Sequence, residues 1–164
     1  MGVLTDDMKR VVREQSLAFV ATVNPDGGPN VSPKGTISVW DDDHLVFADL
    51  ASPTTVANLR ERPATEVNVV DPLSRKGYRL RGRAEVIDGG GDWPRLLDFF
   101  ARRGVSNVAA RVRAVVRIHV DRVRPLVSPA YDSGLTEPEL RARWSRHYER
   151  LGRGERVDDP ESNP

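Results

Sequence analysis

The sequence predicts a mainly β fold, a six-stranded antiparallel β-barrel with a few peripheral helices. Valine is the commonest apolar residue, with 22 Val against 13 Leu and 3 Ile, and β-branched side chains suit a pleated sheet. Apolar and polar residues alternate over several segments, and short turns join most of them, which favours hairpins over a doubly wound sheet. The 164 residues fit one domain. We expect it to span residues 1–151, with a disordered tail over 152–164.

The first part of the chain predicts one helix and a meander of three strands. Thr5 can cap a helix whose first turn holds Asp6 and Asp7, and acids stabilise the positive end of a helix. Turn-forming residues at 24–28 and 41–43 separate the alternating segments and predict hairpins. The expected helix covers residues 6–15, and the expected strands cover residues 17–24, 29–40 and 44–50.

The second part predicts three helices and three further strands. Ser52 and Pro53 can begin a short helix, because Ser is a good N-cap and Pro favours the first helical position. Asp92 can cap the next helix, and Thr136 with Glu139 forms a capping box for the last one. The expected helices cover residues 52–62, 92–104 and 136–151, and the expected strands cover residues 65–70, 78–87 and 111–123.

Charge and composition exclude several classes of protein. Lys and Arg number 25 against 24 Asp and Glu, so no net positive field favours nucleic acid, and we expect none as a partner. The absence of Cys removes disulfides, thiolate metal sites and a Cys nucleophile, and it fits a reducing compartment. No stretch approaches the roughly 18 apolar residues of a membrane-spanning helix. We therefore expect a cytoplasmic protein with no membrane contact and no metal site.

Catalytic side chains of the familiar kinds are scarce. The sequence has no dinucleotide-binding glycine motif, no Walker loop, no nucleophile elbow and no zinc-protease motif. His44, His119 and His147 lie on different expected elements, and each is more simply a solvated or half-buried histidine. Acidic pairs and runs at 41–43 and 158–159 are typical of solvated charge. An enzyme with this sequence would need a cofactor for its difficult step.

The start of the expected helix at Ser52 is the best local candidate for an anion site. Free backbone N–H groups and the helix dipole favour a phosphate there, and Ser52, Thr54 and Thr55 add three hydroxyl groups. An ordinary capped helix explains the same residues. Spacing alone favours that simpler interpretation, because the segment contains no cation.

Two short cationic segments are further candidates. Residues 32–36, Ser-Pro-Lys-Gly-Thr, lie within an expected strand, where Pro removes a ladder hydrogen bond and Gly allows close approach of a backbone. A ligand against the strand explains this pattern, and so does a bulge at a barrel edge. Residues 75–77, Arg-Lys-Gly, precede Arg79, Arg81 and Arg83 on one face. Such a stripe is typical of a solvated face or a dimer contact.

A set of short segments points to one known family when the segments are taken together. They are Leu-Ala-Phe-Val-Ala-Thr-Val at 17–23, Pro-Asn-Val-Ser-Pro-Lys-Gly at 29–35, Phe-Ala-Asp at 47–49, Ser-Pro-x-Thr-x-x-Asn-Leu at 52–59, Arg-Lys-Gly-Tyr-Arg at 75–79, Gly-x-Ala at 82–84 and Ser-Pro-Ala-Tyr-Asp at 128–132. In this order they resemble the pyridoxamine 5′-phosphate oxidase-like flavin-nucleotide-binding proteins. The match extends over about residues 1–150 and is specific as a set rather than motif by motif.

The resemblance implies an FMN-binding split barrel that forms a homodimer, with FMN bound at the subunit interface. The loop and helix after the third strand would hold the flavin phosphate, and basic residues from the second strand, a loop or a partner subunit would add countercharge. Residues 32–36 would run beside the isoalloxazine ring. The cofactor-binding residues implied in this way are Ser32, Pro33, Lys34, Gly35, Thr36, Asp49, Ser52, Thr54, Thr55, Asn58, Arg75, Lys76, Gly77, Arg79 and Tyr131.

One position departs from the family pattern. Many relatives carry a basic residue within the phosphate segment, where this chain has Pro53 and Thr54. Lys34 or an arginine must then supply the countercharge. The pyridoxal-phosphate specificity pattern of the true oxidases is not evident either, so that substrate does not transfer to this chain.

The function expected from these features is that of an FMN-dependent oxidoreductase. Flavin N5 would exchange a hydride with a reduced nicotinamide or a small organic substrate, and the protein would supply position and electrostatics. The alternatives are a flavin carrier without turnover, a barrel that binds the deazaflavin F420 or haem, and a structural dimer without a ligand. Haem is less favoured because the candidate segments contain no histidine.

Overall fold

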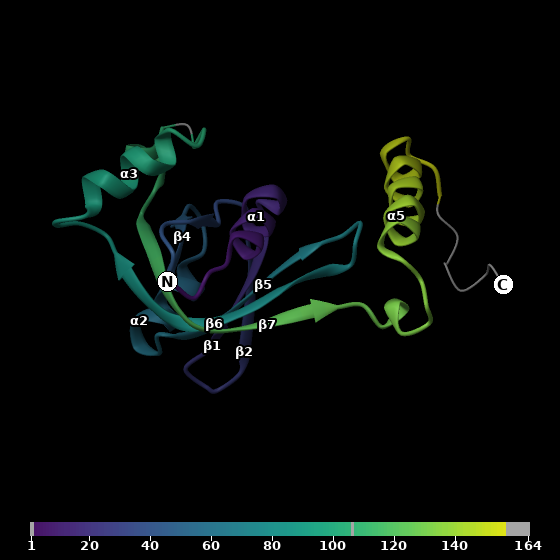
Figure 1. The fold of residues 1–164 in the computed structure, drawn as a ribbon. Coiled ribbons are helices and arrows are strands. Elements are labelled where there is room, and N and C mark those ends of the chain that lie inside the picture. The colour runs from purple at the N-terminus through teal and green to yellow at the C-terminus, as the bar shows by residue number, and fades with distance from the viewer. Residues whose placement is uncertain (1, 106, 157–164) are drawn as a thin grey trace.

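The computed structural model describes residues 2–105 and 107–156. Within these residues, seven antiparallel strands form one sheet in the order β2-β1-β5-β6-β7-β4-β3, and the sheet curls into an open barrel (Figure 1). The expected mainly β split barrel is confirmed. The strands are β1 (Ala18–Val23), β2 (Pro29–Lys34), β3 (Ser38–Val39), β4 (His44–Asp49), β5 (Ala64–Asp71), β6 (Lys76–Ile87) and β7 (Ala114–Val127). The helices are α1 (Asp6–Gln15), α2 (Pro53–Glu61), α3 (Trp93–Ala101), α4 (Val108–Arg111), the 3-10 helix η1 (Pro129–Tyr131) and α5 (Glu137–Gly152).

The expectation of one strand over residues 29–40 is wrong, and this raises the strand number from six to seven. β2 pairs with β1 at one edge of the sheet, whereas β3 pairs with β4 at the other edge. Thr36 holds the segment that connects β2 to β3 against β4. The Thr36 hydroxyl donates to the carbonyl of Ala48 at 3.1 Å and accepts from the N–H of Ala48 at 3.0 Å. The alternation of apolar and polar residues therefore continues through residues 29–40, although the chain leaves β1 and pairs with β4 instead.

An edge position explains Pro33. In the described sheet β2 has only β1 as a neighbour, and the pairing of Phe19 with Pro33 belongs to an unbroken register. A proline on the open side of an edge strand costs no ladder hydrogen bond, so neither a bulge nor a ligand is needed there. A Cβ atom built on Gly35 meets nothing within 4 Å among the described residues beyond its chain neighbours, so close packing does not require glycine there.

β7 begins and ends later than the expected strand over residues 111–123. Residues 108–111 form the short helix α4, which the sequence did not predict, and the strand starts at Ala114. It pairs with β4 as far as His119 and then continues along β6 to Val127. Pro125 is tolerated in this extension because the strand has a neighbour on one side only.

Two apolar cores lie on the two faces of the sheet. The first fills the barrel interior and includes the buried side chains of Phe47, Leu59 and Leu80. The second lies outside β4 and β7, where α3 covers Val46 and Val115. The residues predicted to share one face of the last strand are all buried, and they are Val112, Ala114, Val116, Ile118 and Val120. Val112 nevertheless precedes β7 and packs in the second core, so its place on that face is wrong. Val115 on the opposite face is buried as well because α3 packs there.

The ends of β5, β6 and β7 project beyond the barrel as an arm that carries η1 and α5 (Figure 1). We call residues 70–78 and 125–152 the arm. Ion pairs fasten α5 to the hairpin tip, with 2.7 Å between Arg141 and Asp71 and 2.8 Å between Lys76 and Glu137. The predicted capping box is present, since Glu139 accepts from the N–H of Thr136 at 2.7 Å.

The chain after α5 is described only as far as residue 156. Residues 153–156 follow the helix closely, and Glu155 pairs with Arg153 at 2.7 Å and Arg150 at 3.2 Å. Residues 157–164 of the expected tail lie outside the described residues. Among the helices of the described ranges, none has the length and apolarity that crossing a bilayer requires.

Candidate functional site

The structure brings β2 together with the start of α2. Asn30 of β2 donates its amide N–H groups to the hydroxyl oxygens of Thr22 at 2.9 Å and Thr55 at 3.3 Å. Asn30, Ser32 and Lys34 alternate with the exposed residues of β2 and share the better-buried face of the strand. Residues from separate segments of the sequence therefore belong to one site, which we call the barrel site. Its residues are Asn30, Ser32, Lys34, Asp49, Ser52, Thr54, Thr55 and Asn58.

Lys34 is the cation of the barrel site. Its side chain is almost enclosed, at 5% exposure, and its ammonium group donates to Ser32 Oγ at 2.5 Å and lies 5.4 Å from the centre of the Phe47 ring. Burial lowers the pKa of Lys34, and the charge of Asp49 opposes this effect only in part. No carboxylate of the described residues pairs with Lys34 within 4.0 Å, so the amine is available to an external anion.

The N-terminus of α2 is available in a similar way. Ser52 stands at the N-cap position, but its side chain makes no cap hydrogen bond. Its hydroxyl and its backbone N–H both donate to Asp49 Oδ1, at 2.6 and 2.8 Å. The first N–H groups of α2 therefore have no side-chain acceptor, and Thr54 beside them is exposed. Such N–H groups favour an anion at this end of a helix.

Asn58 and Thr55 hold α2 in place. Both side chains are buried, and the Asn58 amide donates to Thr22 Oγ1 at 3.0 Å and to Asn24 Oδ1 at 2.9 Å. These bonds tie the second turn of α2 to β1 and its turn. The geometry thus gives Asn58 a positioning role at the barrel site, with its donors already used inside the protein.

Five further predicted residues lie on the arm or on the outer face of the sheet, and they are Arg75, Lys76, Gly77, Arg79 and Tyr131. Lys76 bonds Glu137 and lies 4.5 Å from the Tyr131 ring, whose hydroxyl donates to the carbonyl of Ser74 at 2.6 Å. Hydrogen bonding to Glu137 raises the pKa of Lys76. The tip of the arm points away from α2 (Figure 1), and the structure does not join these residues to the barrel site within one chain.

The other predicted arm residues have local explanations. The guanidinium group of Arg75 lies 3.5 Å from the centre of the Trp144 ring. A Cβ atom on Gly77 would stand 2.0 Å from the carbonyl oxygen of Val69, so close strand packing requires glycine there. Arg79 is exposed on the outer face of β6, with 3.8 Å to Glu66.

A pocket of about 270 Å³ adjoins Gly35 and Thr36. Sequence reasoning missed its two cations, Arg13 after the middle of α1 and Arg103 after α3. Burial and the charge of Arg13 lower the pKa of Arg103. No sequence signal joins two residues so far apart, and only the barrel places them together. Its lining residues are Arg13, Ser16, Gly35, Thr36, Ile37, Ser38, Val39, Phe100, Arg103 and Val105.

Comparisons with solved structures support the same barrel. HupZ of Group A Streptococcus has a TM-score of 0.68 and 32% sequence identity, with 77% of this chain and 96% of that chain covered. An FMN-binding protein from Syntrophomonas wolfei shares the fold, with a TM-score of 0.60, 16% identity and coverage of 74% and 84%. An F420 reductase also shares it, with a TM-score of 0.58, 21% identity and coverage of 74% and 98%.

A comparison with the curated proteins finds no match. The sequence model described as pyridoxamine 5′-phosphate oxidase matches residues 4–126. This range includes the barrel site and all seven strands apart from the last residue of β7, and it ends before η1 and α5. The chain therefore belongs to the pyridoxamine 5′-phosphate oxidase family.

Proposed function

We propose that the barrel site binds FMN and that the protein is an FMN-dependent oxidoreductase. The observation that carries the proposal is the buried amine of Lys34, which has no carboxylate within 4.0 Å among the described residues, beside the uncapped N-terminus of α2. A phosphate group would satisfy both features. The FMN-binding protein of the same fold is consistent with this ligand.

The residues present fit a flavin phosphate. Lys34 supplies the positive charge that Pro53 and Thr54 do not, and the α2 N–H groups with the Thr54 hydroxyl supply donors. Asn58 and Thr55 keep the helix end against β1 and β2. When bound, FMN would supply hydride exchange through its N5 atom.

The pocket beside Gly35 and Thr36 is our candidate for the substrate site. It adjoins the segment proposed to run along the isoalloxazine ring, and it holds two guanidinium groups, from Arg13 and Arg103. Two such cations favour a small substrate with a carboxylate or phosphate group. The residues of this chain would orient the substrate and exclude water, as position and electrostatics are what a protein adds to a flavin.

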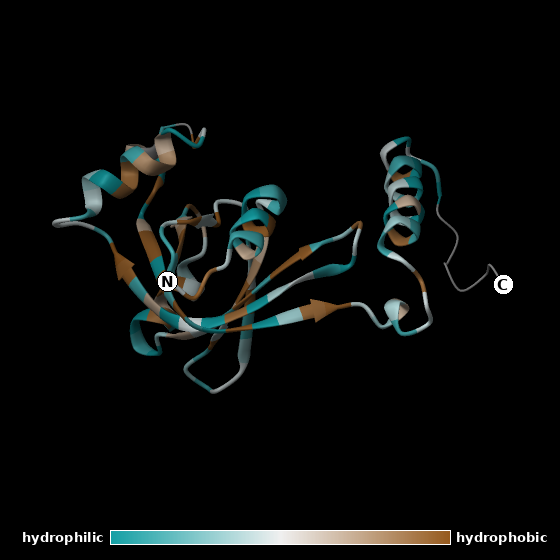
Figure 2. Ribbon diagram, viewed as in Figure 1, coloured by the Kyte–Doolittle hydropathy of each residue, from teal (hydrophilic) through white to brown (hydrophobic). Residues whose placement is uncertain are grey.

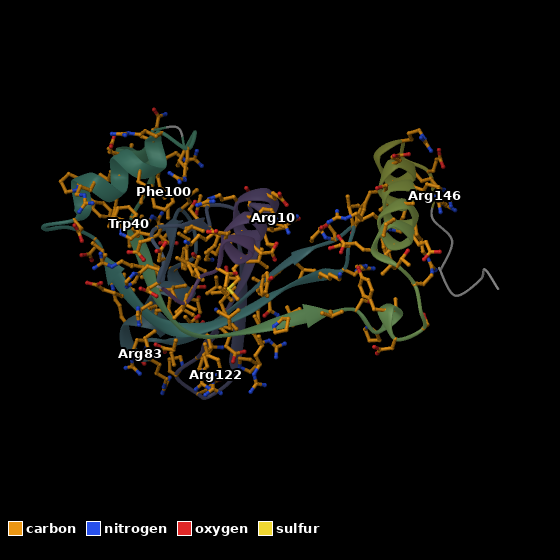
Figure 3. All side chains as sticks on the ribbon, in the orientation of Figure 1. Arg10, Trp40, Arg83, Phe100, Arg122 and Arg146 are labelled. Atoms are coloured by element: carbon orange, nitrogen blue, oxygen red, sulfur yellow. The ribbon has the colours of Figure 1, made fainter. Side chains whose placement is uncertain are left out.

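We also propose a homodimer with the cofactor at its interface. On the outer face of β1 and β2, Phe19 is 50% exposed and Val31 is 60% exposed, and adjoining apolar side chains of this size indicate a contact surface. Arginines of β6 and β7 lie on the same face, and Figure 3 shows Arg83 and Arg122 pointing away from the barrel interior. A second copy on this face would bring Arg79 of β6 to the interface between the subunits.

F420 is the second candidate ligand. The outer face holds five exposed arginines, which are Arg79, Arg81, Arg83, Arg122 and Arg124. The phosphate and acidic tail of F420 suit such a surface, and an F420 reductase has the same fold.

The first experiment is an absorption spectrum of the purified protein, followed by denaturation and chromatography of any released chromophore. We expect FMN, and F420 would favour the second candidate. A colourless protein that binds neither added cofactor would contradict flavin binding. Stopped-flow reduction by NADH or NADPH then tests turnover, because a carrier would hold FMN and show no fast reduction.

A further inference from the structure

A cleft of about 500 Å³ separates α5 from the rest of the arm. It lies at the end of the molecule that Figure 1 shows farthest from α3, and most of it lies after residue 126, where the match to the family model ends. Six of its nine lining residues lie outside the family match, whereas Val70, Arg75 and Leu126 lie within it. The lining residues are Val70, Arg75, Leu126, Val127, Ser128, Ala130, Leu140, Arg143 and Trp144.

The walls of the cleft are largely apolar. Val70 and Val127 are 40% and 55% exposed, and the ends of β5 and β7 appear hydrophobic in Figure 2. Leu140 closes the cleft on the α5 side and is itself buried. Apolar side chains gathered in a concave surface favour an apolar ligand group.

Two cations line the cleft, and neither has an anionic partner. The nearby carboxylates, Asp71 and Glu137, already pair with Arg141 and Lys76. Among the described residues, Arg75 and Arg143 form no salt bridge, and their guanidinium groups make no hydrogen bond to any other side chain or to the backbone. Within the part of the chain that the structure describes, the cleft thus holds two guanidinium groups and no carboxylate that pairs with them.

The backbone of Arg75 closes the β5–β6 hairpin turn, and its N–H donates to the carbonyl of Asp71 at 2.8 Å. Its φ angle is 57°, in the left-handed region that Gly or Asn adopts far more easily than Arg. The guanidinium group lies 3.5 Å from the centre of the Trp144 ring, which fixes its plane at the mouth of the cleft.

We propose that this cleft binds a small organic anion with an apolar body. The carboxylate or phosphate head of the ligand bonds Arg75 and Arg143, and the body packs on Val70, Leu126 and Val127. A volume of about 500 Å³ falls within the usual range for small-molecule sites. The site is separate from the barrel site and does not depend on flavin binding.

The test is calorimetric titration of the full-length protein, with its cofactor bound, using 2-naphthoate as the probe. We expect a binding event that weakens at least about tenfold in Arg143→Ala, because a charge-assisted hydrogen bond is lost. Arg146→Ala is the matched control, since Arg146 lies on α5 (Figure 3) but does not line the cleft. It should change the affinity less than about twofold.

Three further measurements test the requirement for charge and the position of the site. The neutral analogue 2-naphthamide should bind at least about tenfold more weakly than 2-naphthoate. Arg143→Lys should keep more of the affinity than Arg143→Ala, which separates lost charge from lost folding. Any change in tryptophan fluorescence on binding should disappear in Trp144→Phe.

Three results would overturn the proposal. The first is no binding of 2-naphthoate to the wild-type protein. The second is an affinity for 2-naphthoate that is unchanged in Arg143→Ala, or an affinity of the wild type for 2-naphthamide that equals its affinity for 2-naphthoate. The third is sedimentation showing that Arg143→Ala dissociates an oligomer, because the cleft would then be covered by a second copy of the chain.

Discussion

Lys34 of the barrel site and Lys76 of the arm show how differently two regions of this molecule use a cation. Lys34 is buried, and burial lowers its pKa. Its ammonium group donates a hydrogen bond to a neutral acceptor, the hydroxyl of Ser32. Lys76 is half exposed, bonds Glu137, and has a raised pKa. Both were candidates for the flavin phosphate from sequence alone.

The difference shows which cation has a structural partner and which does not. In the arm, exposed ion pairs fasten α5 to the hairpin tip, so the charges already serve the fold. In the barrel, Asp49 is engaged by Ser52, and Lys34 has no carboxylate within 4.0 Å among the described residues. An unpaired buried charge costs stability, and a bound anion would offset that cost.

The largest expected effect compares two buried leucines, one in each region. Leu59→Ala should lower the free energy of unfolding by about 2–5 kcal/mol, because Leu59 packs in the barrel core. Leu140→Ala removes a leucine that belongs to neither core. In this variant α5 should detach, while the strands should unfold at nearly the same urea concentration as in the wild type. Urea unfolding followed by circular dichroism, with hydrogen exchange of α5, measures both.

Equal losses of global stability in the two leucine variants would show that the arm and the barrel unfold as one cooperative unit. The comparison between the regions would then fail, since it requires the arm to open independently.

A smaller effect is expected at Asn58. Asn58→Ala removes the donor for a buried acceptor, Thr22 Oγ1, and a half-buried one, Asn24 Oδ1, and should cost about 1–3 kcal/mol of stability. Asn68→Ala is the control, because Asn68 lies on the outer face and accepts only a 3.4 Å bond from Arg79. Its effect on the urea midpoint should stay within about 0.5 kcal/mol. Similar losses in both variants would contradict the positioning role of Asn58.

The smallest predicted effect is the pH dependence of stability due to Lys34. Its folded pKa lies below the unfolded value of 10.5, so between these values the unfolded chain binds more protons and stability rises with pH. Lys34→Met removes this contribution. The stability advantage of Lys34→Met over the wild type, measured without flavin by urea unfolding, should therefore shrink as pH approaches 10.5. An advantage that grows with pH would contradict the assigned environment of Lys34.

Local sequence patterns predicted most of the fold. Alternation located β6 and the buried face of β7, and cap residues located α1, α2 and α5 because their signals lie within a few residues of each other. The separation of β2 from β3 could not be predicted this way, since it depends on the contact of Thr36 with Ala48 across the barrel. The extension of β7 past Pro125 depends likewise on which strands are neighbours.

The candidate site was predictable only in part. The sequence identified Lys34 and Ser52, but the contact of β2 with α2 through Asn30 and Thr55 appears only in the folded chain. Arg75 and Lys76 have the right chemistry for phosphate and lie on the arm, so their contact with a flavin through a partner subunit stays a prediction. Arg13 and Arg103 gave no signal, because their common pocket joins elements distant in sequence.

The most direct test of the account is the FMN affinity of three proteins: the wild type, Lys34→Met and Lys76→Met. Quenching of flavin fluorescence on titration gives each Kd. We predict that Lys34→Met weakens FMN binding at least about tenfold, through loss of the phosphate countercharge, and that Lys76→Met changes it less than about twofold. An unchanged affinity in Lys34→Met, or a greater loss in Lys76→Met, would contradict the assignment of the flavin phosphate to the barrel site.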